Sequence, residues 1–274
     1  MIDNSTKTLG NFQVWKLTEK TLTFPTKKLL PNAEANLAEP GELSVSVHSW
    51  LIESAGAKII VDTGIGNHKR RTQPVFNDQN SDFLERLERA GFGRKEVTHV
   101  LLTHLHGDHV GWNTIQENGR WLPTFPNAAY IMPRTSIDHL EKTDGDPLMP
   151  LYLDSIKPVI DAGQATLIEP DVEPLPGFTY ISTPGHSRDH CSIILRTSGG
   201  IGLFAGDVMH NQLQVQHPNL NSIFCADAEA AQASRMKVLA FAADHHVTYF
   251  SSHFAGSSMG EVTRSSDGFS WTFV

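Results

Sequence analysis

The chain has 274 residues, a formal net charge of −8 at pH 7, and a composition of 39% hydrophobic and 19% charged residues. This length can bury a sizeable core in one large domain or two small ones, and the composition is that of an ordinary globular protein. The acidic balance and the lack of a Lys/Arg block disfavour a nucleic-acid ligand, because phosphate binding needs a basic surface.

Two features bear on the compartment. Cys191 and Cys225 lie far apart and form no CxxC motif, which indicates a reducing compartment without a disulfide framework, with a single bridge as the alternative. The first residues show no cationic region before an apolar one, and no run of about 18 apolar residues exists, so neither a signal peptide nor a membrane span is predicted. We therefore expect a cytoplasmic protein, with a processed precursor as the alternative.

The first 42 residues are expected to form an N-terminal arm or extra strands of a single domain that spans 1–274. Short apolar segments lie at 12–15 and 21–24. The irregular stretch between Pro25 and Pro40 has three interpretations: an arm over an active site, a dimer contact, or a surface loop, of which the surface loop is the simplest.

Beyond residue 42, hydrophobic periodicity predicts the secondary structure. The expected strands are 43–52, 58–61, 97–102, 129–132, 165–168, 178–182, 191–195, 201–205, 247–250 and 269–273. The expected helices are 78–92, 136–142, part of 146–163 and 227–244. Strands outnumber helices, and both fall in two runs without a repeat of 20–50 residues.

The densest group of metal-ligand side chains follows the strand predicted at 97–102. From residue 103 it runs Thr-His-Leu-His-Gly-Asp-His-Val-Gly. Alternate side chains of an extended segment share a face, so His104 and His106 project the same way. Gly107 then lets the chain turn, which brings Asp108 and His109 round as a second pair. Two such pairs suit two adjacent divalent ions and are not typical of a histidine-rich surface turn without metal.

Each of three later strands ends in a further candidate ligand. These residues are His186, Asp207 and His253. Polar groups at the ends of buried strands are the usual way in which a rigid scaffold builds a site. The two carboxylate oxygens of Asp207 could bridge two ions. Each residue alone is most simply a loop residue, but their joint occurrence with the 103–109 motif favours a metal site.

These motifs, with Asp62-Thr63-Gly64 at the end of the 58–61 strand, resemble those of the metallo-β-lactamase superfamily of dinuclear hydrolases. The pattern covers about residues 43–255 and is most similar to the lactonase and methyl parathion hydrolase-like group. The resemblance implies an α+β fold, a four-layer αββα sandwich with the site at one edge between two sheets. By matching positions it implies that His104, His106 and His186 hold one ion, that Asp108, His109 and His253 hold the other, and that Asp207 and a hydroxide lie between the ions. Asp62 would hydrogen-bond and orient a ligand histidine.

Two residues are expected to take part in the chemistry. Asp108 is a candidate proton shuttle as well as a ligand. His210 stands where many acyl-homoserine lactonases of this superfamily have a tyrosine that contacts the substrate, and a related subgroup has histidine there. His210 is therefore expected either to donate a hydrogen bond to the developing oxyanion or to pack beneath the site. The expected cofactors are two divalent ions per chain, zinc first, with Mn, Co and Fe as alternatives.

The resemblance implies that a bridging hydroxide opens a lactone or cleaves a carboxylic ester. An apolar wall without a cationic cluster favours a small, neutral, partly hydrophobic substrate, and the family suggests a homodimer. The candidate pocket residues, each of which could equally be a core residue, are Ile65, Trp112, Met149, Leu153, Met209, Phe224 and Phe254.

Other activities of the same site are alternatives. An organophosphate triesterase is compatible because phosphotriesters are also neutral, and a β-lactamase is compatible although the long segment between His109 and His186 favours the lactonase group. A glutathione thioesterase would need a helical extension, for which the 21 residues after His253 are too few. A nuclease would need a basic surface, and a one-iron sulfur oxygenase would leave His109 and His253 without a role.

Overall fold

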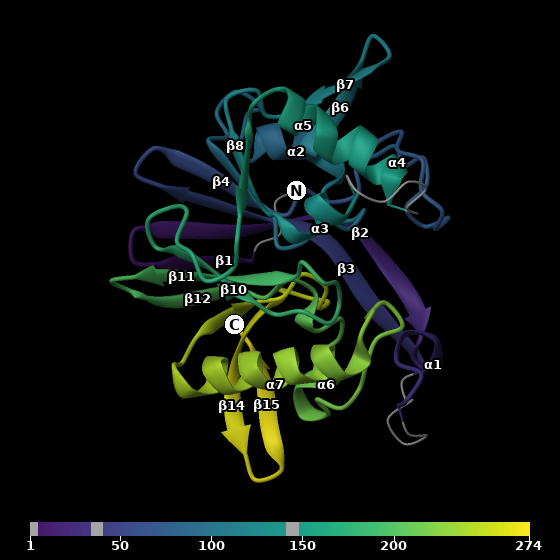
Figure 1. The fold of residues 1–274 in the computed structure, drawn as a ribbon. Coiled ribbons are helices and arrows are strands. Elements are labelled where there is room, and N and C mark those ends of the chain that lie inside the picture. The colour runs from purple at the N-terminus through teal and green to yellow at the C-terminus, as the bar shows by residue number, and fades with distance from the viewer. Residues whose placement is uncertain (1–4, 34–40, 141–147) are drawn as a thin grey trace. The chain divides into compact units, whose positions relative to one another are not determined.

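The computed structural model describes residues 5–33, 41–140 and 148–274 (Figure 1). The chain divides into two compact units: unit 1 is Met1–Glu19 and Val47–Glu169, and unit 2 is Lys20–Ser46 and Pro170–Val274. Strands β2 (Phe12–Pro25) and β3 (Glu42–Ser54) contribute residues to both units. In the described part of the chain, every helix is too short or too polar to cross a membrane.

The larger sheet has seven strands in the order β1-β2-β3-β4-β5-β8-β9. Besides β2 and β3, these are β1 (Thr6–Leu9), β4 (Ala57–Val61), β5 (His99–Leu101), β8 (Ala129–Pro133) and β9 (Ala165–Ile168). Strands β4, β5, β8 and β9 run parallel. Because the carboxyl ends of parallel neighbours lie at one edge of a sheet, Asp62 after β4 and the 103–109 loop after β5 lie next to each other.

Helices α2 (Phe83–Arg89) and α5 (Lys157–Asp161) contribute apolar residues to the core of unit 1. Phe83 and Leu87 lie four residues apart on one face of α2, and they join Val100 of β5 and Tyr130 of β8 in one buried cluster. The remaining elements of unit 1 are the 3₁₀ turn η2 (Gly111–Asn113), β6 (Thr114–Glu117), β7 (Arg120–Pro123), α3 (Thr135–Leu140), α4 (Met149–Leu151) and the π-helical turn η3 (Tyr152–Ile156).

The second sheet belongs to unit 2 and has six strands in sequence order. They are β10 (Phe178–Ser182), β11 (Cys191–Thr197), β12 (Gly200–Phe204), β13 (Thr248–Phe250), β14 (Met259–Ser265) and β15 (Gly268–Phe273). Only the β12–β13 pairing is parallel. The loops after these two strands carry Asp207 and His253, which therefore emerge at the same edge.

Helix α7 (Ala228–Asp244) is the longest helix among the described residues, and it is capped as the sequence predicts. Asp227 accepts a hydrogen bond from Ala230 N at 3.0 Å, which satisfies an amide of the first turn. Val238 and Leu239 of α7 join Tyr249 of β13 in the core of unit 2. The shorter elements of this unit are α1 (Thr26–Leu29), η4 (Gly206–Val208) and α6 (Leu213–Gln216).

Some predicted boundaries are wrong. The helix expected over 78–92 covers only Phe83–Arg89, because the preceding residues are held in a loop, where Ser81 N donates to Asn67 Oδ1 at 2.8 Å. The expected helix at 136–142 corresponds to α3, while its last two residues and the start of the 146–163 segment lie outside the described residues. Strands β6, β7 and β14 were not predicted, because polar residues interrupt their apolar alternation.

Candidate metal centre

Asp62 joins the loop after β4 to the loop after β5. Its φ of 55° lies in the left-handed region, which aspartate tolerates better than most residues. Asp62 Oδ1 accepts from Thr103 N at 2.9 Å, while Oδ2 accepts from Thr103 Oγ1 at 2.8 Å and lies 2.9 Å from His109 Nδ1. With Nδ1–H of His109 donating to this buried carboxylate, Nε2 is the ring nitrogen that is directed to a metal.

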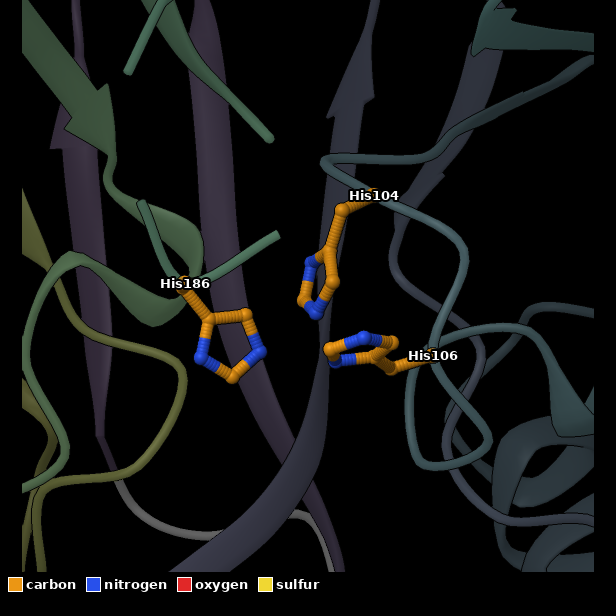
Figure 2. A group of neighbouring side chains, drawn as sticks. All are labelled: His104, His106 and His186. Carbon is orange, nitrogen blue, oxygen red and sulfur yellow. The ribbon is translucent and has the colours of Figure 1, made fainter. Parts of the chain in front are cut away.

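His104, His106 and Asp108 come from the same turn as His109. The His104 ring centroid lies 4.6 Å from that of His106 and 4.1 Å from that of His109. Figure 2 shows the imidazoles of His104 and His106 directed into the same space. Thr103 Oγ1 lies 3.0 Å from His104 Nδ1, and because this hydroxyl donates to Asp62 it can accept from His104. His104 therefore also presents Nε2.

In unit 2, three histidines surround one oxygen of Asp207. Asp207 Oδ2 lies 3.0 Å from His253 Nε2, 3.2 Å from His186 Nε2 and 3.4 Å from His210 Nε2. All four side chains are buried. The ligand atoms of His186, Asp207 and His210 lie within 4.8 Å of one another and could hold a metal ion. Imidazole nitrogen and carboxylate oxygen, gathered in a dry environment, fit zinc and similar divalent ions.

Two residues of unit 2 fix the orientation of this group. His253 Nδ1 lies 2.8 Å from the Ser46 carbonyl oxygen, to which it donates, so that Nε2 faces Asp207. The backbone N–H of Asp207 donates to His190 Nε2 at 2.8 Å, and His190 Nδ1 lies 2.9 Å from the Thr183 carbonyl oxygen. From the sequence the role of His190 was undecided, because its partners lie 7 and 17 residues away and no short motif joins them.

Arg235 is a second residue that sequence analysis missed. It is fully buried within α7, and burial lowers the pKa of its guanidinium. Its Nε donates to the Val208 carbonyl at 3.1 Å, and Nη1 donates to the Pro218 carbonyl at 2.6 Å. Because Val208 follows Asp207 directly, these bonds hold the η4 turn in place. An arginine inside a helix gives no sequence signal of such contacts.

His210 has a fully buried ring beside Asp207. Burial lowers the pKa of His210, and the hydrogen bond and charge of Asp207 oppose this effect. The ring stacks on His253 with centroids 5.3 Å apart and lies 5.7 Å from the Phe224 ring. A lowered pKa keeps the imidazole neutral near pH 7, so His210 can donate one hydrogen bond without carrying a charge.

The seven candidate pocket residues occupy different environments. Ile65, Trp112, Met209 and Phe254 are buried, Met149 and Phe224 are half-buried, and Leu153 is exposed. Trp112 belongs to the core of unit 1, where its ring stacks on Phe83 with centroids 5.5 Å apart. Its Nε1 donates to Glu19 Oε1 at 2.8 Å, a contact that the sequence did not suggest.

Comparisons with known proteins agree with this description. The sequence profile of the metallo-β-lactamase superfamily matches residues 44–253. An N-acyl homoserine lactonase of Bacillus thuringiensis is 26% identical over 186 residues, which cover 62% of this chain and 66% of the lactonase. The match thus spans just under two thirds of that relative's own length.

Solved structures support the fold. AbOPH, a hydrolase in the β-lactamase superfamily, is similar with a TM-score of 0.84 at 21% identity, covering 100% of this chain and 98% of AbOPH. AidC, a dizinc quorum-quenching lactonase in complex with a product, gives a TM-score of 0.81 at 20% identity, covering 98% and 96% of the two chains. These similarities confirm the predicted α+β metallo-β-lactamase sandwich.

Proposed function

This chain belongs to the metallo-β-lactamase superfamily, and from this premise we propose that it is a hydrolase, and more specifically a metal-dependent lactonase. The observation that carries the proposal is the buried group of three histidines around Asp207, in a chain whose curated relatives include N-acyl homoserine lactonases. A histidine-rich carboxylate centre of this kind suits metal-assisted hydrolysis.

We propose that the ligands expected from the sequence hold two divalent ions. One ion would be held by His104, His106 and His186, the other by Asp108, His109 and His253, with Asp207 contacting both. The orientation of the rings supports this assignment, because His104, His109 and His253 each have Nδ1 within 3.0 Å of a protein oxygen. When bound, two such ions supply a hydroxide near neutral pH and polarise the scissile carbonyl.

The residues of the chain would then act on the substrate. His210 would donate a hydrogen bond to the oxyanion that develops at the carbonyl carbon, which a neutral imidazole with one N–H can do. Asp108, which is half-buried and has Oδ1 3.8 Å from His109 Nε2, would take the proton from the attacking oxygen and pass it to the departing alkoxide. In a lactone this alkoxide stays attached to the product.

A neutral, partly hydrophobic substrate fits the surroundings of His210. The half-buried Phe224 packs beside His210, and Phe24 of β2 packs edge-on against Phe224 with ring centroids 5.8 Å apart. Apolar rings next to a polar centre favour an acyl or aryl group over a phosphate-rich ligand. The net charge of −8 agrees with this preference.

A substrate panel on zinc-loaded protein tests the proposal. The panel contains homoserine lactones of several acyl lengths, aryl esters, a phosphotriester, nitrocefin and a glutathione thioester. We expect the lactones to give the highest kcat/KM, activity to disappear with a chelator, and zinc to restore it. Inert lactones beside a different substrate class turned over at about 10⁴ M⁻¹s⁻¹ or more would refute the lactonase assignment.

Metal analysis tests the ligand assignment separately. His106→Ala in unit 1 and His186→Ala in unit 2 should each lower the zinc content, as should Asp207→Asn, which preserves shape but removes the charge. Asp244→Asn is the matched control, because Asp244 is exposed and pairs with Arg264. If the His186 variant kept the wild-type zinc content and affinity, His186 would not be a zinc ligand.

A further inference from the structure

Two loops of unit 1 form a short ladder of hydrogen bonds. Thr63 N donates to the His109 carbonyl at 2.6 Å, Gly111 N to the Gly64 carbonyl at 2.8 Å, and Trp112 N to the Thr63 carbonyl at 2.9 Å. The backbones are in such close contact that a Cβ on Gly111 would overlap the carbonyl of Ile65. The loop that carries Asp62 and the loop that carries His109 must therefore move together.

The Asp62–His109 bond closes one end of this ladder, and Glu19 closes the other. Glu19 lies in β2 and reaches both loops. Its Oε2 accepts from Ile65 N at 2.6 Å, and its Oε1 accepts from Trp112 Nε1 at 2.8 Å. Ile65 lies three residues after Asp62, and Trp112 lies three residues after His109. The Asp62–His109 bond and the Glu19 bonds therefore join the two loops at opposite ends of the ladder.

The packing around Glu19 is specific for this carboxylate. A Cβ on Gly64 would overlap Glu19 Oε2, so glycine leaves the space that the carboxylate fills. Ser81 Oγ donates to Glu19 Oε1 at 3.3 Å. Burial raises the pKa of Glu19, and in the described part of the chain no cationic side chain pairs with it. A glutamate placed here without a counter-ion is costly, and its strongest hydrogen bonds all go to the two loops of the candidate centre.

We propose that Glu19 is a positioning residue that latches the two loops and thereby fixes His109 against Asp62. Without the latch, the Ile65–Trp112 end of the ladder would open, and His109 would lose the fixed direction of Nε2. This gives a segment of the N-terminal region a role in the centre through the loops, without contact with the metal or the substrate. The inference rests on the metal site proposed above, but not on the lactone as substrate.

Hydrogen exchange on the metal-free protein is the primary test, because it needs neither metal nor substrate. In Glu19→Ala, the amides of Ile65, Gly111 and Trp112 should exchange faster, while the amides of β5 and β8 keep their protection. Glu53→Ala, which removes an exposed glutamate from β3 of the same unit, is the matched control. A general rise in exchange across unit 1, or none beyond the control, would overturn the proposal.

Zinc affinity is the second measurement, by competition with a chromophoric chelator. We expect Glu19→Ala to bind zinc about 10-fold more weakly than the wild type. This is the lower end of the loss of about 10–100-fold that is typical when a residue that orients a metal ligand is removed. An unchanged affinity would overturn the coupling of the latch to His109. If the wild type bound no zinc, the proposed function would fail, whereas the exchange pattern would still decide whether Glu19 holds the loops.

Two conservative variants keep the test decisive if Glu19→Ala does not fold. Glu19→Gln has one acceptor oxygen, so it can satisfy Ile65 N or Trp112 Nε1 but not both. Trp112→Phe removes the indole N–H and leaves a smaller aromatic ring in the position that stacks on Phe83. Glu19→Gln should therefore accelerate amide hydrogen exchange in the two loops of the otherwise wild-type protein. The same substitution should accelerate it less in a protein that already carries Trp112→Phe. Equal effects in both backgrounds would contradict the latch.

Discussion

Lys69 offers a quantitative test of the electrostatics of unit 1, because its side chain has no exposed surface. Lys69 Nζ donates to Thr114 Oγ1 at 2.5 Å and to the Asp154 carbonyl at 2.9 Å, and it lies 3.7 Å from the centroid of the Trp121 ring. The Asp154 carboxylate is already bound by Arg71, through bonds of 2.7 and 2.9 Å. Two cations therefore share one anion, and burial lowers the pKa of Lys69 to about 7.

The sign of the pH effect follows from the proton counts. Between the folded pKa of about 7 and the ordinary value of 10.5, the unfolded chain binds more protons at Lys69 than the folded chain does. The free energy of unfolding therefore rises with pH in this window, by at most about 1.4 kcal/mol per pH unit. Between pH 7 and pH 9 the gain is about 2 kcal/mol, because the folded group is half protonated at the lower limit. Below pH 7 the contribution levels off.

Lys69→Met removes this titration and keeps the Arg71–Asp154 pair. Relative to the wild type, the variant should thus lose about 2 kcal/mol of stability from pH 7 to pH 9. Urea unfolding with excess chelator measures the difference without interference from metal ligands. Lys95→Met, which removes an exposed lysine of the same unit, controls for the loss of one positive charge. If the difference in free energy of unfolding between Lys69→Met and the wild type stayed constant to within about 0.5 kcal/mol from pH 7 to pH 9, the lowered pKa of Lys69 would be refuted.

Three further variants test the site. Asp62→Asn should weaken zinc binding by about 10–100-fold in a chelator competition, because Asp62 orients His109; an unchanged affinity would contradict this role. Gly111→Ala should lower the free energy of unfolding, measured by urea denaturation, by about 1–3 kcal/mol. Gly41→Ala is the control, because a Cβ there meets open space, and it should have no such effect. Equal stabilities of the two variants would argue against the close loop contact. His210→Ala should lower kcat on a lactone about 100-fold with the zinc content unchanged, whereas loss of zinc would make His210 a ligand.

The sequence predicted those features whose residues lie close together along the chain. The 103–109 motif lies directly after β5, and Asp207 and His253 follow the parallel pair β12–β13, as buried strands followed by polar residues predict. Helix α7 was found from its aspartate cap and apolar spacing. Each of these signals is local, so neighbouring residues carry it.

Contacts between distant segments gave no such signal. Glu19 lies 93 residues before Trp112, and Lys69 lies 85 residues before Asp154. Glutamate and lysine are common surface residues, so their residue type alone does not reveal that these two side chains have distant partners. Strand β14 was missed for a related reason: its pairing with β13 and β15 stabilises it, although its own sequence includes glycine and charged residues.

The hydrogen bonds of the candidate ligand histidines show that the 103–109 motif alone does not orient them. His104, His109 and His253 each have Nδ1 held within 3.0 Å of a protein oxygen, from Thr103, Asp62 and Ser46 respectively. Only Thr103 belongs to the motif, whereas Asp62 follows β4 and Ser46 lies in β3. Because protein oxygens from several elements orient these rings, the metal affinity of the proposed centre would depend on strands that hold none of the proposed ligands.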